Sequence, residues 1–213
     1  MHAIGWRGSV MLLMMVMVLT GCAYKVETVS VPAFNTVTSF DAKVPGRWLL
    51  YIDADRLDAV LRPRDMNCAA YTFPVAMKDG FQGTIRQTLA NLIESTTEIS
   101  TPQSVESAKK AGNRGIIIVR GERLDGYLQV LPGFWNARLA TDVTLTATVT
   151  VDSGSGRLFG QTFDARGRSE TDVGFACAGG APSARLASED AMKDMARRIG
   201  EAISNSERVR TAR

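Results

Sequence analysis

Histidine is almost absent from this sequence: its 213 residues include one, His2, close to the N-terminus. The rest of the chain therefore offers no imidazole that could act as a general base, join a Ser-His or Cys-His pair, or bind a metal ion. This absence argues against most hydrolases and metalloenzymes. We expect no metal site, no cofactor and no enzymatic activity.

A long apolar run is also missing. The longest, at residues 10–19, is about half of the roughly 20 residues that a membrane-crossing helix needs. It follows a short polar start that carries Arg7 and ends in small residues before Cys22. This arrangement is typical of a cleaved secretory signal peptide, here residues 1–21. The alternative is a hydrophobic N-terminal helix beside a chance cysteine.

The tetrapeptide Leu19-Thr20-Gly21-Cys22 resembles the lipobox of bacterial lipoproteins. The resemblance implies that Cys22 is diacylglycerylated, that the chain is cut before it, and that the new amino terminus receives a further acyl group such as palmitate. Two or three acyl chains hold a protein on a membrane almost permanently. In this family an aspartate after the cysteine retains the protein in the inner membrane. Ala23 stands there, so we expect an outer-membrane anchor on the periplasmic side.

Two cysteines remain once Cys22 is lipidated. Cys68 and Cys177 form an even pair in an oxidising compartment, so we predict a disulfide between them. It would close a loop of about 110 residues, for which chain entropy gives a stabilisation approaching about 5 kcal/mol. Two separate buried thiols are the alternative.

Neither sign of charge dominates the chain. Lysine and arginine total 25, aspartate and glutamate total 22, and the two signs are interleaved. Basic residues do not gather with aromatic ones, so we do not expect nucleic acid as a partner.

The mature chain divides into a lead, one domain and a tail. Residues 22–45 hold Pro32, Pro45 and several serines and threonines without periodicity, so we predict a lipidated tether. Residues 46–207 suffice for one domain with a sizeable core. We predict a flexible basic tail at residues 208–213.

Hydrophobic periodicity predicts an α+β domain. Predicted strands cover residues 47–53, 68–77, 115–130, 141–151 and 158–164, and predicted helices cover 79–93 and 183–203, the second starting at Ser183 or Ser188. Strands separated by single helices favour a mostly antiparallel sheet of about five strands with two main helices packed on one face.

The order of these elements, the lead cysteine and the alanine-rich final helix resemble a broad group of small envelope lipoproteins over residues 47–205. The group includes the lipopolysaccharide-assembly lipoprotein family, the auxiliary lipoproteins of ABC transport systems and the YajG-like lipoproteins. The resemblance implies a plug, a scaffold or a lipid-handling partner, and it supplies no catalytic residues.

Two short motifs suggest chemistry that their surroundings do not support. Ser107 and Lys110 match S-x-x-K, in which a lysine could activate a serine, but the segment is polar and the companion motifs are absent, so we interpret the match as a solvated helix face. Residues 53–58 have the acidic spacing of a calcium loop, yet its sixth position is Asp58 and its twelfth is Arg64. We interpret this run as a charged surface turn.

Phe134 and Trp135 lie in a predicted loop between strands. Large aromatics in a loop can anchor a partner or a lipid, or they can close the end of the core. We mark both residues as a candidate partner contact.

Together these features favour a membrane-anchored, periplasm-facing lipoprotein that serves an envelope complex as a non-enzymatic accessory or assembly component. An exposed strand edge or the Phe134–Trp135 loop would dock on that complex. One alternative is a lipid or small-molecule binding module with a cavity between helices and sheet. A second alternative is a hydrolase that uses serine and lysine.

Overall fold

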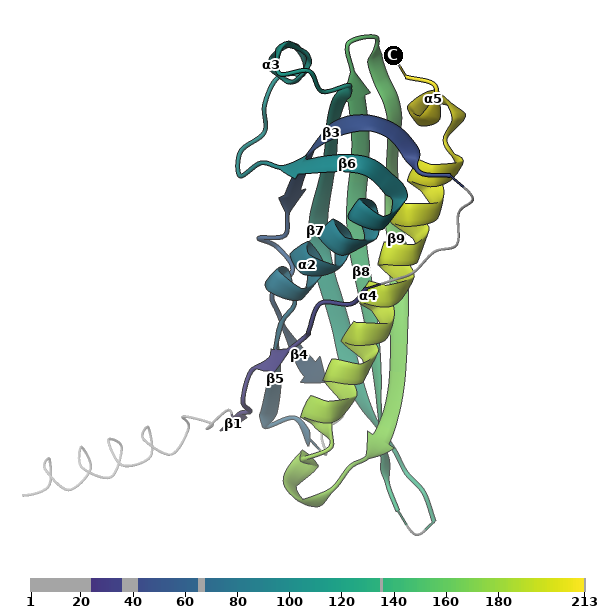
Figure 1. Ribbon diagram of the computed structural model, residues 1–213. Coiled ribbons are helices and arrows are strands. Elements are labelled where there is room, and N and C mark those ends of the chain that lie inside the picture. The colour runs from purple at the N-terminus through teal and green to yellow at the C-terminus, as the bar shows by residue number, and fades with distance from the viewer. Residues whose placement is uncertain (1–23, 36–41, 65–67, 135, 213) are drawn as a thin grey trace, which may run out of the picture.

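Three long antiparallel strands form the spine of the molecule (Figure 1). The computed structural model describes residues 24–35, 42–64, 68–134 and 136–212. Within it, β7 covers Gly115–Leu131, β8 covers Arg138–Ser153 and β9 covers Gly156–Asp172. Strand β8 pairs with β7 on one side and with β9 on the other, both antiparallel. The strands predicted at residues 141–151 and 158–164 are confirmed, and both are longer than predicted.

The two faces of β8 differ as its alternating sequence predicts. Its apolar side chains are buried in the main core: Val143, Leu145, Ala147, Val149 and Val151. The threonines between them are only partly buried and point to the opposite face of the sheet. We call that opposite face the outer face.

Six shorter strands widen the sheet beside β7. These are β1 (Tyr24–Lys25), β2 (Val29–Ser30), β3 (Val44–Asp53), β4 (Ala59–Pro63), β5 (Tyr71–Ala76) and β6 (Ile93–Glu98). Strands β3 and β4 run parallel to different parts of β7, and β6 runs parallel to β3. Strand β5 is antiparallel to β4 and parallel to β1 and β2.

The sheet is therefore mixed and has nine strands, so the predicted mostly antiparallel sheet of about five strands is wrong in both respects. Periodicity identifies a strand but not its neighbour, and β3 meets β7 only after a long crossover that the sequence pattern does not specify. Four strands were missed: β1 and β2, with two residues each, β4, which lies in a charged segment that ends at Pro63, and β6, whose sequence IESTTE lacks apolar alternation.

Two main helices, α2 (Lys78–Leu92) and α4 (Gly180–Asn205), contact each other and lie on the same face of the sheet (Figure 1). This part of the predicted fold is confirmed. Their apolar stripes are buried as expected: Phe81, Ile85, Leu89 and Leu92 in α2, and Met192, Met195, Ile199 and Ile203 in α4. The short helices are α3 (Val105–Lys110), the 3-10 helix η3 (Phe175–Cys177) and α5 (Glu207–Arg210). None of the described helices combines the length and apolar character needed to cross a bilayer.

The main core lies between the sheet and these two helices. Its largest fully buried side chains include Trp48, Phe73 and Phe81. A smaller cluster joins α3 to β3 and β7 through Leu49, Ala108 and Ile116.

Both ends of the described chain pack against the domain. Val31, within the lead predicted as a tether, is buried, and its carbonyl oxygen lies where a Cβ on Gly80 would stand. In the tail predicted as flexible, Val209 and Ala212 are buried, and Arg114 Nη1 donates a hydrogen bond to the Ala212 carbonyl over 2.8 Å. The described parts of both segments thus belong to the fold.

Candidate functional site

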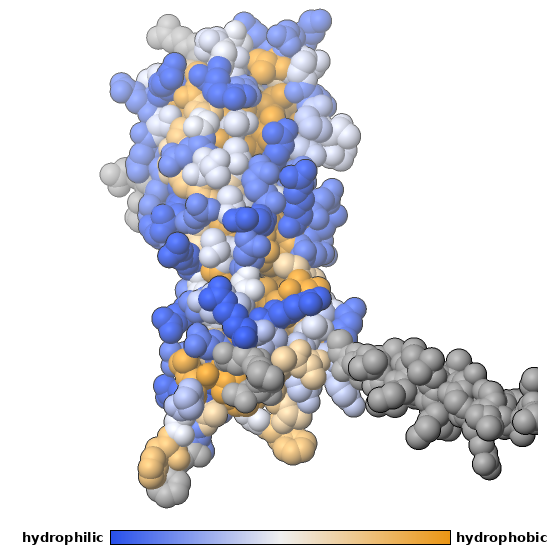
Figure 2. Space-filling model, turned by 180° about the vertical axis from the view of Figure 1, so that it is seen from behind, coloured by the Kyte–Doolittle hydropathy of each residue, from blue (hydrophilic) through white to orange (hydrophobic). Residues whose placement is uncertain are grey.

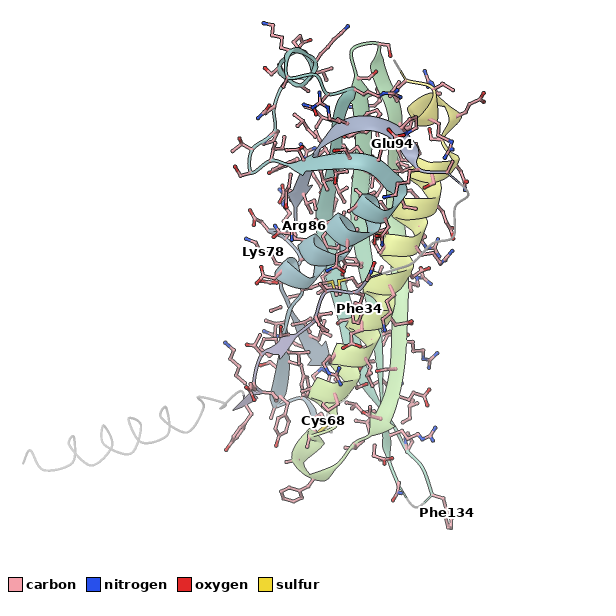
Figure 3. All side chains as sticks on the ribbon, viewed as in Figure 1. Phe34, Cys68, Lys78, Arg86, Glu94 and Phe134 are labelled. Carbon is pink, nitrogen blue, oxygen red and sulfur yellow. A yellow bond between two sulfur atoms is a disulfide. The ribbon has the colours of Figure 1, made fainter. Side chains whose placement is uncertain are left out.

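Two loops lie side by side at one end of the molecule. They are the described residues of the β7–β8 connection, 132–134 and 136–137, and the β9–α4 connection, residues 173–179, and we call them together the loop end. The Val173 N–H donates to the Ala137 carbonyl over 3.1 Å and joins the two loops. Phe134 is 90% exposed and Phe175 is 95% exposed, the highest values among the large hydrophobic residues described. Figure 3 shows Phe134 projecting from the tip of the hairpin.

The predicted disulfide between Cys68 and Cys177 is present and fixes the second of these loops (Figure 3). Ala176 and Cys177 both have left-handed backbone conformations, with φ of 51° and 59°, which non-glycine residues adopt at a cost of about 1–2 kcal/mol each. The Gly179 N–H donates to the Val173 carbonyl over 2.9 Å and closes the loop. The covalent link to Cys68 therefore holds a backbone shape that the chain alone disfavours.

The same end of the molecule also holds the start of the described chain. The Tyr24 N–H donates to the Ala70 carbonyl over 2.6 Å, and the Tyr24 and Tyr71 rings lie 5.7 Å apart. Tyr24 is 65% exposed. Cys68 precedes β5 closely, so β1 and the loop at Cys177 are both attached to the same short segment of chain.

A cleft of about 380 Å³ lies on the outer face of the sheet. Arg64 stacks over the Tyr127 ring at 3.3 Å from its centroid. Asp125 and Asp142 line the same cleft, and the first pairs with Arg123 at 2.6 Å. This cluster was not predicted from the sequence. The alternation of β7 and β8 was the available signal, because it places Asp125, Tyr127 and Asp142 on one face.

The outer face as a whole is largely hydrophilic, whereas apolar residues reach the surface at the lower end in Figure 2. A second, more open groove of about 300 Å³ lies between β2 and the start of α4. Its lining mixes Glu27 and Arg185 with small residues of both elements.

Strand β9 forms one edge of the sheet, since within the described ranges it pairs only with β8. In an antiparallel ladder, opposed residues alternate between hydrogen-bonded and non-hydrogen-bonded pairs. Val173 donates to Ala137, so the odd-numbered residues of β9 are the ones whose backbone groups form hydrogen bonds with β8. The even-numbered residues Asp164, Arg166 and Arg168 then direct their backbone N–H and C=O groups away from β8. This edge is 17 residues long.

The predicted site residues fall in different places. Phe134 belongs to the loop end, while Cys22 and Trp135 lie outside the described residues. Ser107 and Lys110 are both exposed on the six-residue helix α3. The Ser107 N–H donates to Ser104 Oγ, which caps that helix.

The acidic run at residues 53–58 positions a helix. Asp58 Oδ1 accepts hydrogen bonds from the backbone N–H groups of Met77 and Lys78 at the start of α2, over 2.9 and 3.1 Å. Asp55 forms an ion pair with Lys78. In the part of the chain that the structure describes, no three His, Cys, Asp or Glu side chains converge as metal ligands.

No protein-family model matches the chain, and no curated protein sequence is similar to it. Several solved structures resemble its fold at low identity. A Xanthomonas campestris protein of the DUF330 family is 13% identical over 88% of this chain and 99% of that one, with a TM-score of 0.48. A minor lipoprotein from Acinetobacter baumannii is 12% identical over 73% and 90%, with a TM-score of 0.38. A neuraminyllactose-binding hemagglutinin homologue from Helicobacter pylori is 7% identical over 82% and 93%, with a TM-score of 0.47.

Proposed function

We propose that this chain is a lipid-anchored, periplasm-facing accessory protein of a bacterial envelope complex, without catalytic activity of its own. The LTGC sequence ending at Cys22 supports the anchor, and Ala23 favours the outer membrane. The disulfide between Cys68 and Cys177 supports the compartment, because such bonds persist in the oxidising periplasm and are rare in the cytosol.

The observation that carries the accessory role is the open edge of β9. An extended segment of a partner can add to such an edge as a further strand, with backbone hydrogen bonds supplying affinity. At 17 residues β9 is far longer than the usual strand of about 5–6 residues. The exposed charges of Asp164, Arg166 and Arg168 discourage unspecific edge pairing. A partner strand would need a complementary charge pattern.

Two substitutions at one residue test the edge. Arg166→Pro removes a backbone N–H that points away from β8, so it should block strand addition and leave the ladder to β8 intact. Arg166→Ala removes the same side chain and keeps the N–H. Both variants should be compared with wild type by co-purification from detergent-solubilised membranes, followed by mass spectrometry of the captured proteins.

We expect wild type and Arg166→Ala to capture the same envelope protein, and Arg166→Pro to lose it. An unchanged thermal unfolding midpoint would show that the proline variant is folded. Equal capture by both variants would show that the β9 edge is not the docking surface. Loss in both variants would assign recognition to the arginine side chain instead of the backbone.

A second candidate function is a small-molecule binding module. The cleft that supports it lies on the outer face instead of between helices and sheet, and its Arg64, Tyr127 and Asp142 lining suits a polar ligand. Native mass spectrometry of the mature protein from cells would then show an added small mass that Arg64→Ala removes. A wild-type spectrum without any adduct would contradict this function.

A further inference from the structure

We propose that the loop end rests on the lipid bilayer that holds the anchor, so that the domain sits directly on the membrane surface. The inference depends on the proposed acylation of Cys22. It replaces the predicted tether at residues 22–45 with a short covalent link followed at once by folded structure.

Only a short length of chain lies between the anchor and the fold. The backbone N–H groups of Tyr24 and Val26 donate to the carbonyl oxygens of Ala70 and Thr72, over 2.6 and 3.1 Å, and so fix β1 to β5. Cys22 lies only two residues before Tyr24. Two residues span at most about 7 Å. An acylated Cys22 must therefore keep β1 close to the lipid headgroups.

A ring contact and the disulfide connect β1 to the loop end. Tyr24 contacts Tyr71, Cys68 lies three residues before Tyr71, and its disulfide leads to Cys177. Phe175 lies two residues before Cys177 in the same loop. Figures 1 and 3 show β1, Cys68 and Phe134 together at the lower end of the molecule. A bilayer that approaches β1 therefore also approaches both exposed phenylalanines.

The side chains of the loop end also suit a lipid surface. Residues 132–137 and 173–179 contain no charged side chain, although 22% of the whole chain is charged. Their exposed phenylalanines can enter the apolar boundary of the bilayer, and Tyr24 has the amphipathic ring that is enriched at the membrane–water interface. A lipid surface accepts such loops without the desolvation cost that a charged side chain would add.

The opposite end of the molecule is polar and serves as a control. The turn between β8 and β9 consists of Gly154 and Ser155, and Lys109 of α3 packs next to Gly154. Ser155 is exposed. This polar end should stay in water when the loop end meets lipid.

The test uses a photoreactive side chain in the full-length lipidated protein. We would place p-benzoylphenylalanine at position 134, 175 or 155, reconstitute each purified protein in vesicles of phosphatidylethanolamine and phosphatidylglycerol, irradiate, and search the tryptic peptides for phospholipid adducts. The same three proteins would be irradiated in intact cells and examined for protein adducts on gels. The intact mass of each protein reports whether Cys22 carries its acyl groups.

We expect phospholipid adducts at positions 134 and 175 at least tenfold above those at position 155. Equal adduct yields at all three positions in acylated protein would overturn the proposal. Protein adducts in cells at 134 and 175 would also overturn it, because a partner would then occupy the loop end. An intact mass without acyl groups would contradict the proposed anchor itself. That result differs from one in which the protein is acylated but its loop end does not contact lipid.

Discussion

Thr141 on β8 donates a hydrogen bond through its hydroxyl to Ser183 Oγ on α4, over 2.7 Å in the buried interior. Ser169 of β9 lies equally close to the same oxygen and also donates to the Ser183 carbonyl. The first turns of α4 are thus joined to two strands through one serine. This contact holds the helix in place just above the loop end.

Ser183→Ala should lower the free energy of unfolding by about 1–3 kcal/mol, because it leaves the buried Thr141 hydroxyl without its acceptor. Urea denaturation measures the loss. The Thr141→Val and Ser183→Ala double variant should lose less than the sum of the two single changes, since both remove one interaction. Strict additivity of the two changes would contradict the proposed coupling.

Gly167→Ala should destabilise the protein by more than the roughly 1–3 kcal/mol of ordinary overpacking. A Cβ at Gly167 would lie 1.9 Å from the Ala187 carbonyl oxygen, and backbone of α4 cannot move aside as a flexible side chain can. Gly160→Ala on the same strand is the matched control, because its nearest neighbour is the flexible Arg157 side chain at 3.3 Å. Similar melting temperatures for the two variants would argue against close packing of α4 on β9.

Replacing both Cys68 and Cys177 by alanine should lower the free energy of unfolding by about 2–5 kcal/mol, since the disulfide spans 109 residues. Denaturant titrations with and without a thiol reductant measure this effect. Wild type under reducing conditions should unfold at the midpoint of the double variant, and reductant should not change the variant. Identical shifts in both proteins would mean that the reductant acts elsewhere.

Acid should lower the free energy of unfolding, partly because it protonates Asp194. Burial raises the pKa of this carboxyl, but hydrogen bonds from Arg198 and Arg197 outweigh it and hold the pKa below its usual value. A carboxylate with a lowered pKa in the folded state contributes stability above its unfolded pKa of about 4 and loses it as the pH falls further.

Asp194→Asn should therefore lose less stability than wild type between about pH 5 and pH 3. Chemical denaturation at several pH values provides the comparison, and Asp190→Asn, at an exposed position of the same helix, is the control. Parallel pH profiles for wild type and Asp194→Asn would show that the two arginines do not stabilise the carboxylate.

Cys22→Ser should release the processed protein from membranes, because serine provides no thiol for acylation. Sedimentation of cell membranes, with immunoblotting of pellet and supernatant, measures the distribution. A correctly processed Cys22→Ser protein that still sediments with membranes would contradict the lipid anchor.

The parts of the fold with strong periodicity could be predicted from sequence. Val143 to Val151 alternate clearly enough to give β8 and its two faces, and the stripes around Phe81 and Met192 give the two helices. Strand partners could not be predicted, because parallel pairing of β3 with β7 depends on tertiary packing and not on local pattern. Residues 22–45 were predicted as a tether because the burial of Val31 in the core also depends on tertiary packing and not on a local pattern.

The candidate site was predictable only in part. Phe134 stood out because a large aromatic residue in a predicted loop can anchor a partner, and the cysteine pair followed from counting. Phe175 gave no such signal, since its exposure is a property of the tertiary structure and not of a local sequence pattern. The stacking of Arg64 on Tyr127 joins residues far apart in sequence through the pairing of β4 with β7.

The length of β7, β8 and β9 has a consequence for how this protein would find other molecules. Strands of 16 and 17 residues extend about 55 Å at about 3.3 Å per residue. If the loop end rests on the bilayer, the protein would diffuse in two dimensions and occupy a layer next to the membrane that is as thick as the strands are long. Encounters would be confined to molecules that enter this layer, and the long axis would set the height at which each of them is met.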